Sequence, residues 1–244
     1  RKNMTEEIAR RVAETIEINR KRSEEIKKKA KENPSTLSND DYEILYKGFV
    51  LRVTPYEKLM IEKIRSFNAD QKREVLKNLV EAMKAKGLKI LAEDILDSKL
   101  WIAALIDLTT PVLGDLYQKE GSEASALLGL TDFRITPEVK RAIDRSIELL
   151  SESYNETTLK ALRYVLEKGQ REGASLPDLD ESISKIYEIS DKDRAAEVAR
   201  TETFRIANDS TKEAWKQSGV VKTIKWYTAA DEGVCDWCGP MNGK

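Results

Sequence analysis

Apolar residues recur at helical spacing along most of the chain. Between residues 54 and 87 they stand close to three or four positions apart, and the same spacing returns at 139–150, 159–166 and 179–187. A period near 3.6 places such residues on one face of an α-helix, where they pack against a core. The pattern therefore predicts a mostly α protein, a multi-helix array with short connections.

The first residues are expected to form a charged helix. Residues 4–33 carry a thin apolar stripe among many Lys, Arg and Glu residues, which favours a solvated helix or docking arm. Binding of nucleic acid by its basic runs is the alternative. Pro34 breaks this helix, and Ser38 with Asp41 has the spacing of a capping box that starts a short helix.

Caps and helix breakers divide the remaining helical pattern. Thr54-Pro55 combines a cap residue with proline at the first helical position, so a new helix is expected to begin there. Thr110-Pro111 is expected to end another, and residues 129–135 are typical of a loop between subdomains. Later helices are expected to start at Thr136-Pro137, after Asn155 and Thr157, at Ser175 and at Ser190-Asp191, and the last to run to Gly219.

The pattern changes after Gly219. Residues 220–228 are mostly β-branched or aromatic, which predicts a strand and hence a small C-terminal α+β element. A lone strand needs a partner, from this chain, from residues beyond Lys244 or from another subunit. Trp226 and Tyr227 are neighbours in this strand, so their rings are expected on opposite faces.

Composition narrows the classes of function. The 244 residues include 42 Lys and Arg against 43 Asp and Glu, so no global basic field favours nucleic acid or acidic membranes. No apolar stretch approaches the ~20 residues of a membrane span. Histidine is absent from the sequence, which removes the commonest general base and the commonest metal ligand. We therefore expect no enzyme activity.

The two cysteines suggest a metal site that is half built. Cys235 and Cys238 flank a Cys-x-x-Cys-Gly turn, which has the form of a zinc knuckle. Zinc takes four ligands, so Asp231, Asp236 or another chain would have to complete the shell. The spacing also suits a redox pair, although no βαβ pattern surrounds it. Two thiols without a metal is the simplest interpretation, and no cofactor is expected for this chain.

Arg200, Thr201 and Glu202 are successive positions on the last predicted helix. Their side chains therefore point in different directions and do not form one catalytic cluster. We expect Arg200 and Glu202 to make charge-assisted hydrogen bonds that tie this helix to the following strand and its loop. Contact with a partner protein or with DNA is the alternative.

Taken together, these motifs resemble one protein family. The residues that carry the resemblance are Ala195–Thr203 with its Arg200-Thr201-Glu202 core, Asn208, Trp226, Asp231, Cys235 and Cys238. They closely resemble the phage Mu F-like minor head proteins, which are head morphogenesis proteins of tailed phages and prophages. The resemblance implies such a domain over residues 131–244, behind a charged N-terminal helical arm (1–33) and a helical region (34–130).

One feature of the family is missing from this chain. Many relatives carry a His-Pro-x-Cys-x-Cys segment some tens of residues after the first cysteine pair, and it is absent here. We therefore expect the domain to be truncated at its C-terminus, with a zinc site that only a longer native chain would complete.

The resemblance also implies a structural role. Proteins of this family are minor capsid proteins of the portal vertex that act in head assembly and in DNA packaging or ejection. Portal and other capsid proteins are thus the expected partners, with phage DNA as a further one, and no membrane or small-molecule substrate. The expected location is the virion, at the capsid interior or portal vertex, and the host cytoplasm during assembly. The alternatives are the delivery module of an effector or toxin whose enzymatic domain lies beyond Lys244, and the C-terminal part of a portal fusion protein.

Overall fold

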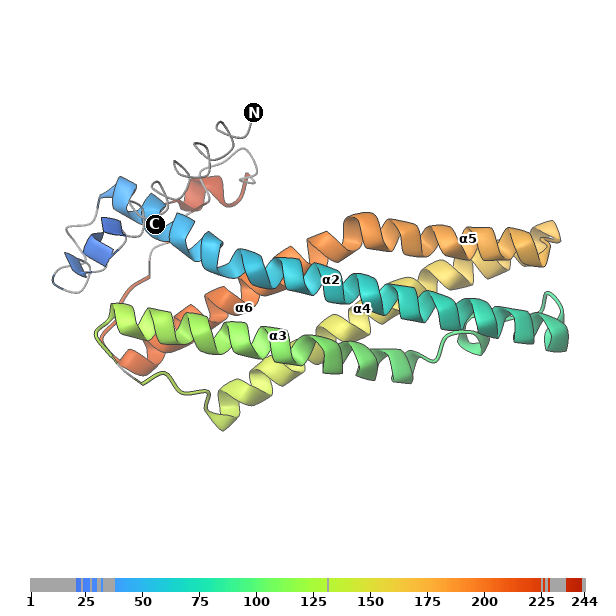
Figure 1. Cartoon of the computed structure of the whole chain (residues 1–244), viewed down its shortest axis with the longest axis horizontal. Coiled ribbons are helices and arrows are strands. Elements are labelled where there is room, and N and C mark those ends of the chain that lie inside the picture. Colours follow the sequence, from blue (N-terminus) through green and yellow to red (C-terminus); the bar gives the residue numbers. More distant parts are fainter. Residues whose placement is uncertain are drawn as a thin grey trace, which may run out of the picture. The chain divides into compact units, whose positions relative to one another are not determined.

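α-Helices make up most of the described chain (Figure 1). The computed structural model describes residues 21, 22, 24–26, 28, 29, 32, 38–130, 132–224, 226, 228 and 236–242. The helices are α2 (Asn39–Lys86), α3 (Ser98–Leu127), α4 (Pro137–Glu172), α5 (Leu176–Ile189) and α6 (Ala195–Ser218). Short 3-10 turns, η2 (Ala92–Asp94) and η4 (Gly239–Met241), and the π-helical turn η3 (Ser190–Arg194) complete the assignment. The predicted mostly α array is confirmed.

The chain divides into two compact units built from segments that are not consecutive. Unit 1 consists of Arg1–Val53, Lys119–Phe133 and Asn208–Lys244, and unit 2 of Thr54–Gln118 and Arg134–Ala207. Among the described residues, the largest fully buried side chains all belong to unit 2: Met60, Ile64, Leu79, Ile90, Ile95, Leu96, Leu105, Leu113, Leu116, Ile147, Leu162 and Ile183. The main apolar core therefore lies in unit 2.

Several of the predicted helix ends are confirmed. Before α2, the Ser38 N–H donates to Asp41 Oδ2 at 2.9 Å and the Asp41 N–H donates to Ser38 Oγ at 3.2 Å, which is the predicted capping box. Ser175 and Asp178 repeat this pattern at the start of α5. α4 ends at Gly173, which has a φ of 68° that a residue with a side chain rarely adopts.

The helix start predicted at Thr54-Pro55 is wrong. α2 runs without a break from Asn39 to Lys86, with Pro55 inside it. An internal proline removes one backbone hydrogen bond and costs about 3 kcal/mol. Val53 in unit 1 and Met60 in unit 2 are both fully buried, so burial of apolar side chains before and after the proline outweighs this cost.

The helix end predicted at Thr110-Pro111 is wrong for a similar reason. α3 continues to Leu127, and Leu113 beyond the proline is fully buried. The hydroxyls of Thr109 and Thr110 donate to carbonyls of the preceding turn at 2.8 and 2.7 Å. Both threonines are therefore interior residues of α3 and do not mark its end.

α3 also corrects the expectation that no segment is long and apolar enough to span a membrane. By length and composition Ser98–Leu127 passes that test, with 39% of its most apolar window buried. Core helices pass the same test, and Leu105, Leu113 and Leu116 of α3 are buried within unit 2.

The break predicted around Asn155 and Thr157 is absent as well. α4 runs from Pro137 to Glu172, and Asn155 is buried in its middle. The hydroxyls of Thr157 and Thr158 donate to the carbonyls one turn earlier, those of Ser153 and Tyr154. The polar residues that resemble a cap in the sequence are therefore interior residues of α4. The helix α4 lies side by side with α5 (Figure 1).

The cap predicted at Ser190-Asp191 is a π-helical turn. α5, η3 and α6 follow one another without a break between residues 176 and 218, and the Ala195 N–H donates to the Ser190 carbonyl five residues earlier. The run ends at Gly219 with a φ of 67°, as predicted.

The strand predicted at 220–228 is not seen. The described residues of this segment, 220–224, 226 and 228, lie in neither a helix nor a strand. The small C-terminal α+β element is therefore not part of the described fold. Of the predicted N-terminal helix, the described residues between 21 and 32 are helical, and residues 4–20 lie outside the described residues.

Candidate functional site

The π-turn η3 keeps the buried faces of two helices in line. Within unit 2, the buried residues of this run are Leu179, Ile183, Tyr187, Ser190, Ala195, Ala199, Thr203, Ile206 and Ala207. Their spacing never exceeds four positions within α5 or within α6, but from Ser190 to Ala195 the step is five. A turn with hydrogen bonds from residue i to i+5 accommodates this step, so both rows face the same core.

Buried polar side chains meet at this turn. The Tyr154 hydroxyl lies 2.9 Å from both Asn68 Oδ1 and Ser190 Oγ. The amide of Asn68 donates to Asp191 Oδ1 at 2.7 Å and more weakly to Ser190 Oγ at 3.3 Å. We call Asn68, Tyr154, Ser190, Asp191 and Arg194 the π-turn cluster; it joins α2, α4 and η3 within unit 2.

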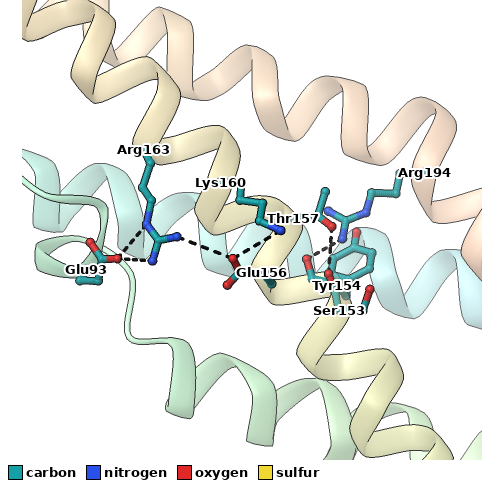
Figure 2. A network of polar contacts seen from close by, with 8 residues as sticks. All are labelled: Glu93, Ser153, Tyr154, Glu156, Thr157, Lys160, Arg163 and Arg194. Atoms are coloured by element: carbon teal, nitrogen blue, oxygen red, sulfur yellow. Dashed lines mark hydrogen bonds and ion pairs between the residues drawn. The ribbon is translucent and has the colours of Figure 1, made fainter.

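Arg194 covers the outer part of this cluster (Figure 2). Its guanidinium carbon lies 3.7 Å from the centre of the Tyr154 ring, close enough for a cation–π contact. Nη1 donates to Thr158 Oγ1 at 3.3 Å, and Nη2 donates to the Tyr154 carbonyl. Burial lowers the pKa of the Arg194 guanidinium, because removal from water disfavours its charged form.

Next to the cluster, some buried polar atoms lack a partner. The Tyr187 hydroxyl donates to Gln71 Oε1 at 3.2 Å, and burial raises the pKa of Tyr187. Within the described residues, Gln71 Nε2, Ser151 Oγ and Asn155 Oδ1 have no hydrogen-bond partner. A buried polar atom without a partner costs about 1–3 kcal/mol, so this layer lowers the stability of unit 2.

An exposed ion-pair network lies further along α4 (Figure 2). Arg163 Nε donates to Glu93 Oε1 at 2.9 Å, and Arg163 Nη1 lies 3.6 Å from Glu156, which Lys160 also contacts at 3.6 Å. The hydrogen bond from Arg163 lowers the pKa of Glu93. These groups are about half exposed or more, so each pair contributes at most about 1 kcal/mol, and only Arg163–Glu93 joins η2 to α4.

The predicted Arg-Thr-Glu residues do not converge. Arg200 lies over the ring of Phe204, with 5.6 Å between the guanidinium carbon and the ring centre. Glu202 accepts from Arg205 Nε at 2.9 Å, and Thr201 is exposed. Among the described residues, Arg200 and Glu202 contact side chains one turn along α6 and make no bond to the segment that follows it.

The remaining predicted residues lie in unit 1. Asn208 is exposed on α6, and Trp226 is 49% exposed. Cys238 is half-buried in the turn before η4, whereas Asp231 and Cys235 lie outside the described residues. In the part of the chain that the structure describes, no group of three or more His, Cys, Asp or Glu side chains could hold a metal ion. The zinc site therefore stays a prediction.

Sequence reasoning did not identify the π-turn cluster. Ser190 and Asp191 have the composition of a helix cap, and nothing in the sequence around Asn68 indicates a buried polar contact. The only signal in the sequence is the run of polar residues 190–194, which interrupts the apolar spacing between Ile189 and Ala195. Comparisons of the chain with protein-family models, curated proteins and solved structures found no match.

Proposed function

We propose that this chain is a minor head protein of a tailed phage or prophage, which docks at the portal vertex and acts in head morphogenesis, DNA packaging or ejection. The observation that carries the proposal is the order of motifs in the sequence: Arg200-Thr201-Glu202 on a helix, the apolar segment 220–228, and the Cys235/Cys238 knuckle. Its mode of action is contact between proteins, without turnover of a substrate. Portal and other capsid proteins are the proposed partners.

Exposed apolar side chains after α6 support a docking role. Val220, Ile224 and Trp226 are 64%, 56% and 49% exposed. Their positions are all even, so they would share one face of an extended chain. A segment with such an apolar face could add to the edge of a partner's sheet as an extra strand. In this mode of binding, main-chain hydrogen bonds provide the affinity and side chains provide the specificity for the partner.

We propose that the small α+β element forms in this way. Among the described residues of 220–228, the Val220 N–H donates to Ser218 Oγ at 3.2 Å and the Thr228 N–H to Asn242 Oδ1 at 3.1 Å. Both acceptors are side-chain atoms, so these bonds build no strand ladder. A strand of a capsid or portal subunit would supply the ladder on docking.

The test is association with the portal oligomer of the same phage under assembly conditions. The wild-type chain is expected to co-sediment with the oligomer, and the double variant Ile224→Ser/Trp226→Ser to lose most of this association. Leu149→Ser is the matched control, since Leu149 is 50% exposed on α4, far along the chain from the docking segment. Absence of co-sedimentation by the wild-type chain would sink the proposal.

A further inference from the structure

Arg194 differs from the other partly buried arginines in its contacts. In unit 1, Arg52 binds the buried carboxylate of Glu120 with Nε at 2.9 Å, and in unit 2 Arg205 binds Glu202. In the described part of the chain, Arg194 contacts only neutral groups, those of Tyr154 and Thr158. A cation that is removed from water without a counter-charge costs free energy. A carboxylate that binds this cation is therefore expected to gain more binding free energy than one that binds an exposed lysine.

One edge of this guanidinium has no partner. Nη1 and Nη2 each direct a proton at α4, toward Thr158 Oγ1 and the Tyr154 carbonyl. Nε and the second proton of Nη2 have no partner among the residues that the structure describes. These two N–H groups form the side edge of the guanidinium, which binds both oxygens of a carboxylate in parallel.

The π-turn cluster holds this edge in place. The Tyr154 hydroxyl is held by Asn68 and Ser190, so the ring under the guanidinium has a fixed orientation. Two hydrogen bonds to α4 then fix the rotation of the guanidinium on that ring. A binding group that is already ordered loses little conformational entropy when its ligand arrives.

We propose that the Nε/Nη2 edge of Arg194 is a binding site for a carboxylate, supplied by an acidic side chain of a partner protein. Arg194 is partly exposed, so a side chain from outside can reach it. The site is argued from unit 2 alone and goes beyond the proposed docking through residues 220–228. Either proposal can fail without the other.

The surrounding charges favour a single carboxylate over a nucleic acid. The cations nearest along α4, Lys160 and Arg163, are already paired with Glu156 and Glu93 (Figure 2). The π-turn adds two acidic residues, Asp191 and Asp193, to its Lys192 and Arg194. Nucleic acid is bound by rows of cations that neutralise several phosphates. Here Arg65 donates to the Asp191 carbonyl at 3.1 Å, and Asp191 and Asp193 alternate with Lys192 and Arg194, so the cations form no continuous row.

The experiment follows the side-chain Nε–H resonances of arginine by NMR. Sodium acetate is titrated against sodium chloride at equal ionic strength, with the Arg194 resonance assigned by its loss in Arg194→Lys. We expect a saturable shift of the Arg194 resonance with acetate and none with chloride. Arg163 is the internal control, because Glu93 already occupies its Nε edge at 2.9 Å, and its resonance should not move.

A second arm uses a short acidic peptide and the same peptide with Gln in place of Glu. The acidic peptide is expected to reproduce the acetate shift, and Arg194→Lys to bind it at least about tenfold more weakly, since lysine cannot offer two parallel N–H groups. If Arg194→Lys misfolds, the Arg194 resonance is assigned in the wild-type chain by correlation with its own backbone amide, and the acetate titration proceeds unchanged. No saturable shift, equal shifts at Arg163, or a shift produced by a DNA duplex but not by acetate would each overturn the proposal.

Discussion

The guanidinium carbon of Arg194 lies 3.7 Å from the centre of the Tyr154 ring, so a cation covers one face of a buried aromatic side chain. Phe67 meets the same ring edge-on, with 6.1 Å between ring centres. The Tyr154 hydroxyl binds Asn68 and Ser190. Tyr154 therefore links α2, α4 and the π-turn through an apolar contact, a cation and hydrogen bonds at once.

Tyr154→Phe isolates the hydroxyl of this link. The ring and its contacts remain, but Asn68 Oδ1 and Ser190 Oγ each lose a buried partner. We expect the free energy of unfolding to fall by about 1–3 kcal/mol, measured by urea denaturation. Tyr164→Phe is the control: Tyr164 is 62% exposed on the same helix, so its change should stay within about 0.5 kcal/mol. Equal, small losses in both variants would show that the cluster does not contribute to stability.

Ser151→Ala should stabilise the protein. Ser151 is fully buried and its hydroxyl has no partner among the described residues, so the substitution removes a desolvated polar group and leaves almost the same shape. The expected gain in unfolding free energy is about 1 kcal/mol or more. Ser153→Ala, at an exposed position of α4, measures the gain from helix propensity alone. The prediction fails if Ser151→Ala raises the unfolding free energy by no more than Ser153→Ala does.

The fold was predictable where a local rule decided it. The capping boxes at Ser38 and Ser175 and the helix end at Gly219 depend on a few neighbouring residues, and the structure confirms them. Pro55 and Pro111 were misinterpreted because burial of distant core residues outweighs the local cost of an internal proline. Propensity is a weak guide wherever tertiary packing opposes it.

The candidate site was harder to predict than the fold. Asn68, Tyr154 and Ser190 are far apart in the sequence, and only the packing of three elements brings them within 3.3 Å of one another. Nothing in the composition of residues 190–194 distinguishes a π-turn from a cap, since both use Ser and Asp. The apolar spacing is interrupted between Ile189 and Ala195, but a cap would interrupt it in the same way, so the five-residue step from Ser190 to Ala195 is seen only from burial in the structure.

Gly121→Ala should destabilise unit 1 through Phe133. A Cβ at position 121 would lie 2.1 Å from Phe133 Cε1, so the ring, now 8% exposed, would have to move outward. We expect a loss of about 1–3 kcal/mol in unfolding free energy. Gly114→Ala is the matched control on the same helix: its Cβ meets nothing within 4 Å, so the variant should gain about 1 kcal/mol from helix propensity.

A double-mutant cycle separates the clash from the helix propensity. In a Phe133→Ala background, Gly121→Ala is expected to become stabilising, as Gly114→Ala is in the wild type. If Gly121→Ala remains destabilising without the Phe133 ring, its cost comes from another contact.

The capping box at Ser175 should weaken in acid. Hydrogen bonds from the side chain and backbone of Ser175 lower the pKa of Asp178 below its usual value of about 3.9. A lowered pKa in the folded state gives a contribution that is complete above the unfolded-state pKa and is lost as the pH falls through the folded-state pKa. The stabilities of the wild type and Asp178→Asn should therefore differ at pH 7 and converge below about pH 4. A difference that stays constant with pH would contradict this assignment.

Deletion of one residue should be tolerated in the π-turn and not elsewhere. Removing the exposed Lys192 shortens the step from Ser190 to Ala195 from five to four, which a regular α-helix accommodates with both buried faces still in line. We expect a folded variant with cooperative unfolding that loses about 1–3 kcal/mol from the displaced Asn68–Asp191 bond. Removing the exposed Lys185 instead rotates Leu179 and Ile183 by about 100° relative to the rest of the run and should abolish cooperative unfolding. Circular dichroism melts of the two deletions decide between the outcomes: if the Lys192 deletion is as disordered as the Lys185 deletion, the π-turn does not accommodate an extra residue.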